Sequence, residues 1–131
     1  MTPAVRWEAP PLGTSAFDAA VLYRDGVAAL IAGVPHADRL LAASVSCDPT
    51  FVLAQVGLSV SRYVATGLAY APPAIAPTGR AERHHAEIVK TWLTGEHRRA
   101  VDLRREHLVE YPGDVLIVWL PALTAGVSGQ T

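Results

Sequence analysis

The chain has 131 residues, the size of one domain, which is enough to bury about two thirds of the surface of the unfolded chain. Lys and Arg total 11 and Asp and Glu total 12, so the charge favours neither nucleic acid nor an anionic membrane as a partner. Hydrophobic residues make up 50% of the chain and charged residues only 18%, a balance that favours self-association.

The single cysteine, Cys47, excludes an internal disulfide and suits a reducing compartment. Residues 1–14 lack the apolar core of a signal peptide, and no apolar run has the length of a membrane-spanning helix. We therefore expect a cytoplasmic protein.

Residues 1–14 carry Pro3, Pro10 and Pro11 without a helical period, which predicts an irregular N-terminal arm. Trp7 in this arm is either an exposed anchor or a lid over an apolar face, and the lid is favoured because a large aromatic ring is rarely left in water. Residues 15–131 are expected to form a single helical domain.

A first helix is predicted from Ser15 to Gly33, with Asp18 near the position of a capping box. Its apolar residues at helical spacing are Phe17, Ala20, Val21, Val27, Ala28 and Ile31. Pro35 suits the first turn of a second helix. The predicted inner stripe of that helix is Ala37, Leu40, Leu41, Ser44 and Val45.

Asp48 and Pro49 predict the N-cap and first residue of a third helix that runs to Thr66 and is closed by Gly67. Its apolar residues line more than one face: Phe51, Ala54, Leu58, Val60 and Tyr63. The proline-rich connector 67–79 excludes a regular helix and predicts a loop that packs through its own apolar residues. Those residues are Leu68, Tyr70 and Ile75.

Residues 81–114 have the length and punctuation of one helix–turn–helix repeat of about 34 residues. Gly95 permits the turn between a fourth and a fifth helix, Ala100 permits their close approach, and Pro112 ends the second of them. Trp92, directly before the turn, is expected in the core.

The same spacing of residues before a helix-ending proline recurs in the first half of the chain. Ala37 and Val45 stand at the same offsets from Pro49 as Ala100 and Leu108 do from Pro112. This internal match favours an array of stacked antiparallel hairpins.

The segment 78–118 resembles the core of the tetratricopeptide repeat protein 38 family. The matching positions are Glu82, His85, Trp92, Gly95, Ala100, Leu108, Pro112 and Asp114. The segment around Asp48, Pro49 and Phe51 resembles the junction between that family's first two repeats. The resemblance implies an all-α, right-handed tetratricopeptide-like array of about six helices, of which this chain corresponds to the N-terminal part, and it implies a scaffold rather than an activity.

A sixth helix is predicted over 114–124, where the sequence is apolar on every side and Pro121 bends or ends the helix. An apolar helix at the end of a short stack must be covered, and we expect a second copy or another protein to cover it. The predicted interface residues are Leu116, Val118, Trp119, Leu120 and Leu123. For Trp119, burial within the subunit is the alternative.

Among the five histidines, His85 shares a helical face with Glu82, a spacing used by metal ligands in helical bundles. A di-iron site needs a second such pair, which the first three helices lack. We therefore expect no metal and no cofactor, and we predict a structural hydrogen bond between Glu82 and His85, with His107 able to meet the same face.

No catalytic motif is recognisable. Cys47 is followed by Asp48, which raises rather than lowers a thiol pKa, and no nucleophile elbow or phosphate loop appears. The run 104–107, with Arg98 and Arg99, is expected to be the solvated face of a helix, or else a small basic patch for an anionic group of a partner.

Two functions compete. The favoured hypothesis is a non-catalytic interaction module that associates with itself or with another protein. The alternative is a small-molecule-binding protein or small enzyme whose pocket has the proline-rich connector as its lid. The lining residues of that pocket are Trp7, Tyr63, Tyr70, Glu82, His85 and His107.

Overall fold

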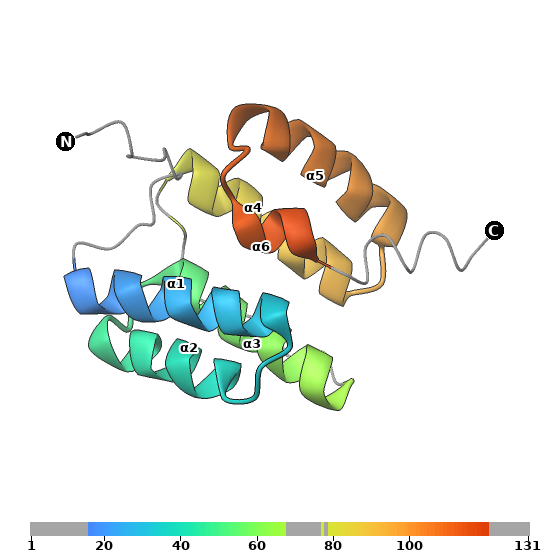
Figure 1. Ribbon diagram of the computed structural model, residues 1–131. Coiled ribbons are helices and arrows are strands. Elements are labelled where there is room, and N and C mark those ends of the chain that lie inside the picture. The colour runs from blue at the N-terminus through green and yellow to red at the C-terminus, as the bar shows by residue number, and fades with distance from the viewer. Residues whose placement is uncertain (1–15, 68–76, 78, 121–131) are drawn as a thin grey trace.

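The computed structural model describes residues 16–67, 77 and 79–120, and within these residues it contains helices and no strand (Figure 1). The six described helices are α1 (Phe17–Ala32), α2 (Ala37–Cys47), α3 (Val52–Thr66), α4 (Arg80–Leu93), α5 (His97–Glu110) and α6 (Val115–Trp119). The predicted all-α array of about six helices is confirmed. None of these helices has the length and apolar character needed to cross a membrane.

Several predictions fall outside the described residues. They concern the N-terminal arm with Trp7, the helix start at Ser15, nearly all of the connector with Tyr70, and the end of the chain from Pro121 onward with Leu123.

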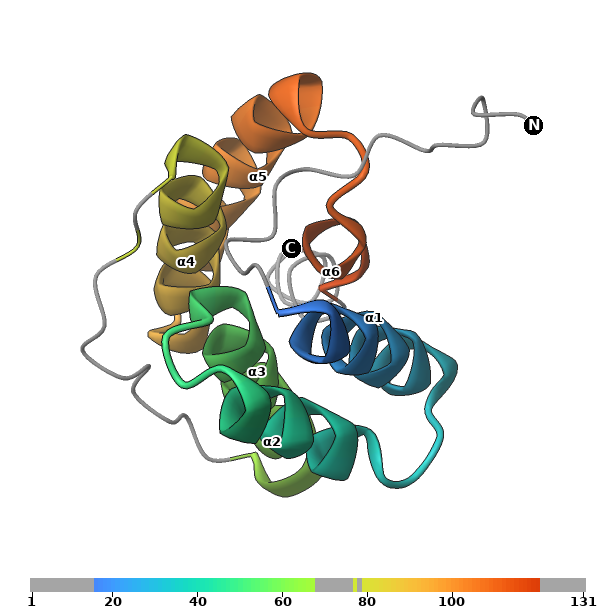
Figure 2. The same cartoon turned by 90° about the vertical axis from the view of Figure 1, so that its left-hand side faces the viewer.

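The first three helices pack together, with α1 and α2 as a hairpin and α3 against both (Figures 1 and 2). The turn between α1 and α2 contains two left-handed residues, Gly33 with φ 71° and His36 with φ 81°. The N-cap of α2 is His36, so Pro35 lies in the turn before the helix and not in its first turn, where the sequence analysis placed it. The predicted inner stripe of α2 is largely confirmed, because Ala37, Leu41 and Ser44 are buried.

The buried face of α1 differs from the predicted stripe. Phe17 is 78% exposed and Ala28 is also exposed. The buried residues are instead Ala19, Tyr23, Gly26, Val27 and Leu30. Because α1 is apolar on several sides, its periodicity leaves the inner face undecided, and packing against α2 selects the face that contains Gly26.

Gly26 shows why this face is chosen. A Cβ atom built on Gly26 would lie 2.7 Å from Cγ of Leu41, which is fully buried in α2. The hydroxyl of Ser44 adds a hydrogen bond of 2.7 Å to the carbonyl oxygen of Ala19. Small side chains on both helices thus permit a close approach that larger ones would block.

The junction before α3 also differs from the prediction. Asp48 ends α2, and its Oδ1 accepts hydrogen bonds from the backbone N–H and the hydroxyl of Thr50. The N-cap of α3 is Phe51, whose buried ring lies 5.3 Å from that of Tyr23. Asp48 therefore stabilises a turn between two helices and does not cap the second one.

The predicted hairpin of α4 and α5 is confirmed, with Gly95 at φ 89° in its turn. α4 also packs against α3, where the rings of Trp92 and Tyr63 meet edge to face at 5.2 Å. Trp92 is 2% exposed, as expected for a core residue, and Ala100 is fully buried at the close approach of α5.

The short helix α6 lies between α1 and the α4–α5 hairpin and contacts all three (Figure 2). Its inward residues Leu116, Ile117 and Leu120 are at most 1% exposed. Burial of each such side chain contributes about 1.5–3 kcal/mol. The helix therefore joins the two halves of the array.

We predict that Gly26→Ala destabilises the protein by about 1–3 kcal/mol, because the added methyl group meets the branch point of a buried leucine. Gly57→Ala is the matched control, since its Cβ would lie 3.2 Å from the flexible end of the same Leu41 side chain. In denaturant unfolding, the free energy of unfolding of Gly26→Ala should be lower than that of Gly57→Ala. The reverse order would refute the close approach of the two helices at Gly26.

Candidate functional site

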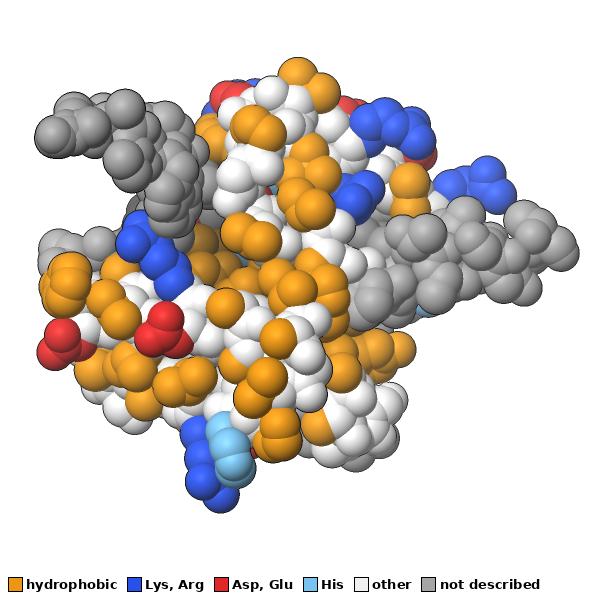
Figure 3. All heavy atoms as spheres, viewed as in Figure 1, with side chains coloured by type: hydrophobic (Ala, Val, Ile, Leu, Met, Phe, Trp, Pro, Cys, Tyr) orange, Lys and Arg blue, Asp and Glu red, His pale blue; other side chains and the backbone are white. Residues whose placement is uncertain are grey.

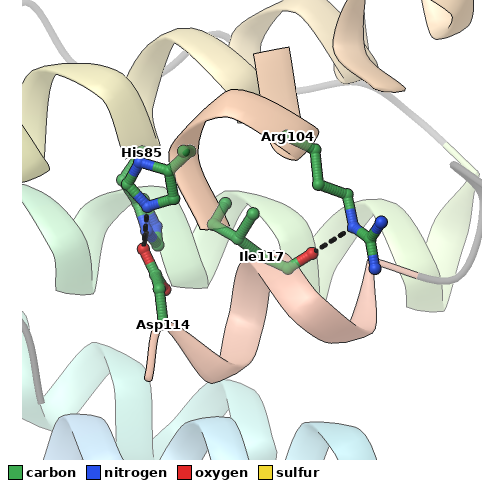
Figure 4. A network of polar contacts seen from close by, with 5 residues as sticks. His85, Arg104, Asp114 and Ile117 are labelled. Atoms are coloured by element: carbon green, nitrogen blue, oxygen red, sulfur yellow. Dashed lines mark hydrogen bonds and ion pairs between the residues drawn. The ribbon is translucent and has the colours of Figure 1, made fainter. Parts of the chain in front are cut away.

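The most unusual feature of the described residues is a buried cluster of two histidines and one carboxylate. His85 Nδ1 and His107 Nε2 each lie 2.8 Å from the same oxygen, Oδ2 of Asp114. The three residues are 0%, 1% and 6% exposed, respectively. Figure 4 shows His85 of α4 pointing at Asp114 where the chain enters α6. We call these three residues the His–Asp–His cluster.

Local structure brings the three residues together. His85 lies on the buried face of α4, and His107 lies in the last turn of α5. Pro112 and Gly113 then reverse the chain in a turn held by the backbone hydrogen bond from Asp114 N to Tyr111 O. Asp114, the N-cap residue of α6, is thereby returned to the end of α5.

The electrostatics favour an ionised carboxylate. Burial by itself would raise the pKa of Asp114, but the positive charge of His85 and the hydrogen bonds from both histidines outweigh burial and hold that pKa well below its usual range. Burial, helped by the negative charge of Asp114, raises the pKa of Tyr23 on α1. The tyrosine therefore remains a neutral phenol close to the cluster.

Because the carboxylate of Asp114 is ionised, we can infer which ring nitrogens of the two histidines carry protons. A carboxylate only accepts hydrogen bonds, so Nδ1 of His85 and Nε2 of His107 both donate to it. The other ring nitrogens, His85 Nε2 and His107 Nδ1, are buried and have no hydrogen-bond partner in the described structure.

A second polar contact holds the other end of α6. Arg104 of α5 donates from Nε to the carbonyl oxygen of Ile117 (Figure 4) and from Nη2 to that of Val118, both at 2.9 Å. These carbonyls belong to the last turn of α6, where no further helical N–H is available. The run 104–107 is therefore not simply a solvated face, because Arg104 binds α6 and His107 is buried.

Four of the predicted pocket residues are described. Glu82, His85 and His107 are buried, and Tyr63 packs on Trp92, while Trp7 and Tyr70 lie outside the described residues. The hydrogen bond predicted between Glu82 and His85 is wrong, because Nδ1 of His85 bonds to Asp114 and its Nε2 bonds to no described residue. Asp114 lies close to His85 only in the folded chain.

Two cavities lined by described residues differ in size and in distance from the cluster. A cavity of about 60 Å³ lies beside His107, space for one or two water molecules. A hollow of about 310 Å³ lies at the start of α2 and the end of α3. Its polar lining includes both Asp38 and Arg62, so it favours no single ligand charge.

Among the described residues, no three His, Cys, Asp or Glu side chains are arranged to hold a metal ion. A histidine backed by a carboxylate orients a metal or a substrate in many enzymes. Such chemistry needs access, and both rings here are covered by protein. The geometry instead matches a structural contact that fastens α6 to α4 and α5.

The described residues of the predicted interface fall into two groups, and Leu123 lies outside the described residues. Leu116 and Leu120 are covered by this chain's own helices, whereas Val118 is 46% exposed and Trp119 is half-buried. Val115, which sequence analysis did not select, is 53% exposed on the same short helix. Within the described residues, α6 therefore offers apolar surface to a partner on its outer side.

Sequence reasoning missed the roles of Asp114 and Arg104. Asp114 follows a Pro–Gly pair at the end of a helix. Such a pair predicts a tight turn, which places the residue after it beside the end of the helix that the chain has just left. Arg104 carries no such signal, because one arginine in a run of charged residues looks like its solvent-exposed neighbours.

Comparisons with family models, curated proteins and solved structures found no match. The likeness to the tetratricopeptide repeat protein 38 family stays a prediction that rests on the residues quoted for it. His85, His107 and Asp114 are therefore interpreted from their geometry alone.

We predict that Asp114→Asn costs about 2–5 kcal/mol of stability at neutral pH, because the neutral amide loses the negative charge that strengthens both hydrogen bonds from the histidines and places an NH₂ group where the second carboxylate oxygen lies. The control is Glu110→Gln, which breaks the exposed ion pair with Arg80 and should cost less than about 1 kcal/mol. Urea unfolding measures both changes.

The same variant tests the pKa of Asp114. The pKa of Asp114 is lower in the folded state than in the unfolded state. The contribution of this carboxylate to the free energy of unfolding is therefore fully present above the unfolded pKa of about 3.9, and it is lost as the pH falls below that value. Wild-type stability should therefore fall more steeply below about pH 4 than that of Asp114→Asn. Parallel pH profiles would contradict an ionised Asp114 in the cluster.

We predict that Arg104→Met loosens α6 and costs about 1–3 kcal/mol, since two charge-assisted hydrogen bonds to its carbonyls are lost. Arg105→Met is the control, because Arg105 is exposed and forms its ion pair, at 3.8 Å, with the exposed Asp102. Hydrogen exchange of the amides of α6 should rise in Arg104→Met alone. Equal exchange in the two variants would remove Arg104 as an anchor.

Proposed function

We propose that this protein is a non-catalytic helical interaction module that associates with itself, as the tetratricopeptide-like hairpins in its sequence suggest. The observation that carries the proposal is the outer side of α6. Val115, Val118 and Trp119 leave apolar surface exposed there, and we call these residues the α6 face. Figure 3 shows hydrophobic side chains gathered over α6 and the adjoining helix α1.

The remaining surface supports this choice of partner. The formal net charge of −1 places little electrostatic repulsion between two copies. The other large exposed apolar side chains lie on different elements. Phe17 begins α1, Val34 lies in the turn after α1, and Val64 and Val109 lie near the ends of α3 and α5, with Val34 and Val64 both lining the hollow of about 310 Å³. The α6 face is thus the best candidate for the centre of a dimer interface.

The cluster supports a scaffold rather than an enzyme or a small-molecule pocket. The two histidine rings are covered by protein and the cavity beside His107 has a volume of about 60 Å³, well below the roughly 300 Å³ of ordinary ligand sites. Cys47 is an exposed free thiol, which fits the proposed reducing setting of the cytoplasm.

We predict that the protein is a dimer at micromolar concentration and that Val118→Asp raises its dissociation constant about tenfold or more, because a charge is placed in the apolar interface. The control is Val109→Asp, at an 83% exposed site on α5, which should leave the dimer intact. Native mass spectrometry and light scattering give the masses, and circular dichroism checks the fold. A monomeric wild type at these concentrations would refute the proposal.

A further inference from the structure

The hollow of about 310 Å³ lies between the turn that joins α1 to α2 and the end of α3. Its volume is at the lower end of the roughly 300–1,000 Å³ of ordinary small-molecule sites. One wall consists of Leu30 and residues 33–38, and the other wall consists of residues 61, 62 and 64–66. Neither α6 nor the His–Asp–His cluster contributes to the described lining, so the hollow is distinct from both.

Backbone hydrogen bonds hold the first wall in place. The N–H groups of Gly33 and Val34 donate to carbonyl oxygens in the last turn of α1 at 3.1 and 2.9 Å. The N–H group of Arg39 donates to the carbonyl oxygen of His36 at 3.0 Å, at the start of α2. A wall that is ordered before a ligand arrives loses little conformational entropy on binding.

The hydroxyl group of Ser61 is a polar group in the lining that has no partner. Ser61 is 6% exposed, and its hydroxyl forms no hydrogen bond within the described part of the chain. Ser59, equally buried on the same helix, differs because its hydroxyl donates to the carbonyl oxygen of Gln55 at 3.2 Å. A buried hydroxyl without a hydrogen bond costs free energy, and a ligand that bonds to it removes that cost.

The rest of the lining is mostly apolar, with half-exposed valines on both walls, Val34 and Val64. A ligand that covers these two side chains removes apolar surface from water. The charged lining residues, Asp38 and Arg62, are exposed and have opposite signs. Attraction of an ion to one of them is offset by repulsion from the other, so a net charge on the ligand brings little gain.

We propose that the hollow is a binding site for a small uncharged molecule with an apolar body and one hydroxyl or carbonyl group. The apolar body lies against Val34 and Val64. The polar group forms a hydrogen bond with the hydroxyl of Ser61, which is able to donate to a carbonyl group or to accept from a hydroxyl group. This function goes beyond self-association, because the α6 face lends no residue to the described lining.

The first test uses cyclohexanol, an uncharged ring with one hydroxyl group, as the probe. In proton–nitrogen correlation spectra of the full-length protein, amide signals of the two walls should shift and saturate with a dissociation constant of about 1 mM or lower. Cyclohexanecarboxylate and cyclohexylammonium are charged probes of similar size. Each of them should bind about threefold more weakly or worse, because transfer of its charge from water is not compensated in the hollow.

Three variants test the role of Ser61. Ser61→Ala should raise the dissociation constant of cyclohexanol about two- to tenfold, since one hydrogen bond between neutral groups is lost. Ser59→Ala is the matched control and should leave this constant unchanged, because Ser59 is not among the lining residues. Ala65→Trp, at an exposed lining position, places an indole ring in the hollow and should abolish binding even if Ser61→Ala fails to fold.

Shifts that do not saturate, that lie away from both walls, or that persist in Ala65→Trp would overturn the site. An unchanged affinity in Ser61→Ala, or equal affinities of the three probes, would overturn the chemistry assigned to its ligand. Native mass spectrometry of the same samples reports the dimer separately. A monomer that binds cyclohexanol overturns only the proposed self-association, and a dimer that does not bind it overturns only the site.

Discussion

A single carboxylate shared by two buried imidazole rings is the interaction on which the arrangement of this protein depends. Asp114 lies between α5 and α6 and accepts hydrogen bonds from His85 of α4 and His107 of α5. A buried charge is costly unless it is paired, so the cluster forms well only where all three elements meet in one geometry. It therefore contributes specificity in the placement of α6 more surely than it contributes net stability.

The second anchor, Arg104, complements the first. The cluster holds the start of α6 and Arg104 holds the carbonyl oxygens at its end, while apolar side chains between them are buried against α1 and the α4–α5 hairpin. A five-residue helix has little stability of its own, so its position is decided by the surfaces around it. In this way a short segment joins two halves that otherwise meet through α3 and α4.

The functional interpretation follows from this division of α6 into two sides. The inner side is fastened by specific polar contacts and by apolar burial, and the outer side exposes valine side chains. Covered histidines without an adjoining ligand-sized cavity fit a structural role. An exposed apolar face on a firmly positioned helix fits a role in association, which we infer for this chain.

The sequence by itself determined the helices, because their ends are marked by local chemistry. Gly33, Gly67 and Gly95 each take a left-handed conformation that glycine adopts without strain, and these positions were predictable as helix ends. Other features depended on tertiary structure. The inner face of α1 could not be predicted, because several sides of this helix are apolar. The fit of Gly26 against Leu41 decides which of these sides is buried. The hydrogen-bond partner of His85 could not be predicted either. The helical spacing suggested Glu82, but the partner is Asp114, 29 residues away, which the turn after α5 and the packing of α6 place beside His85.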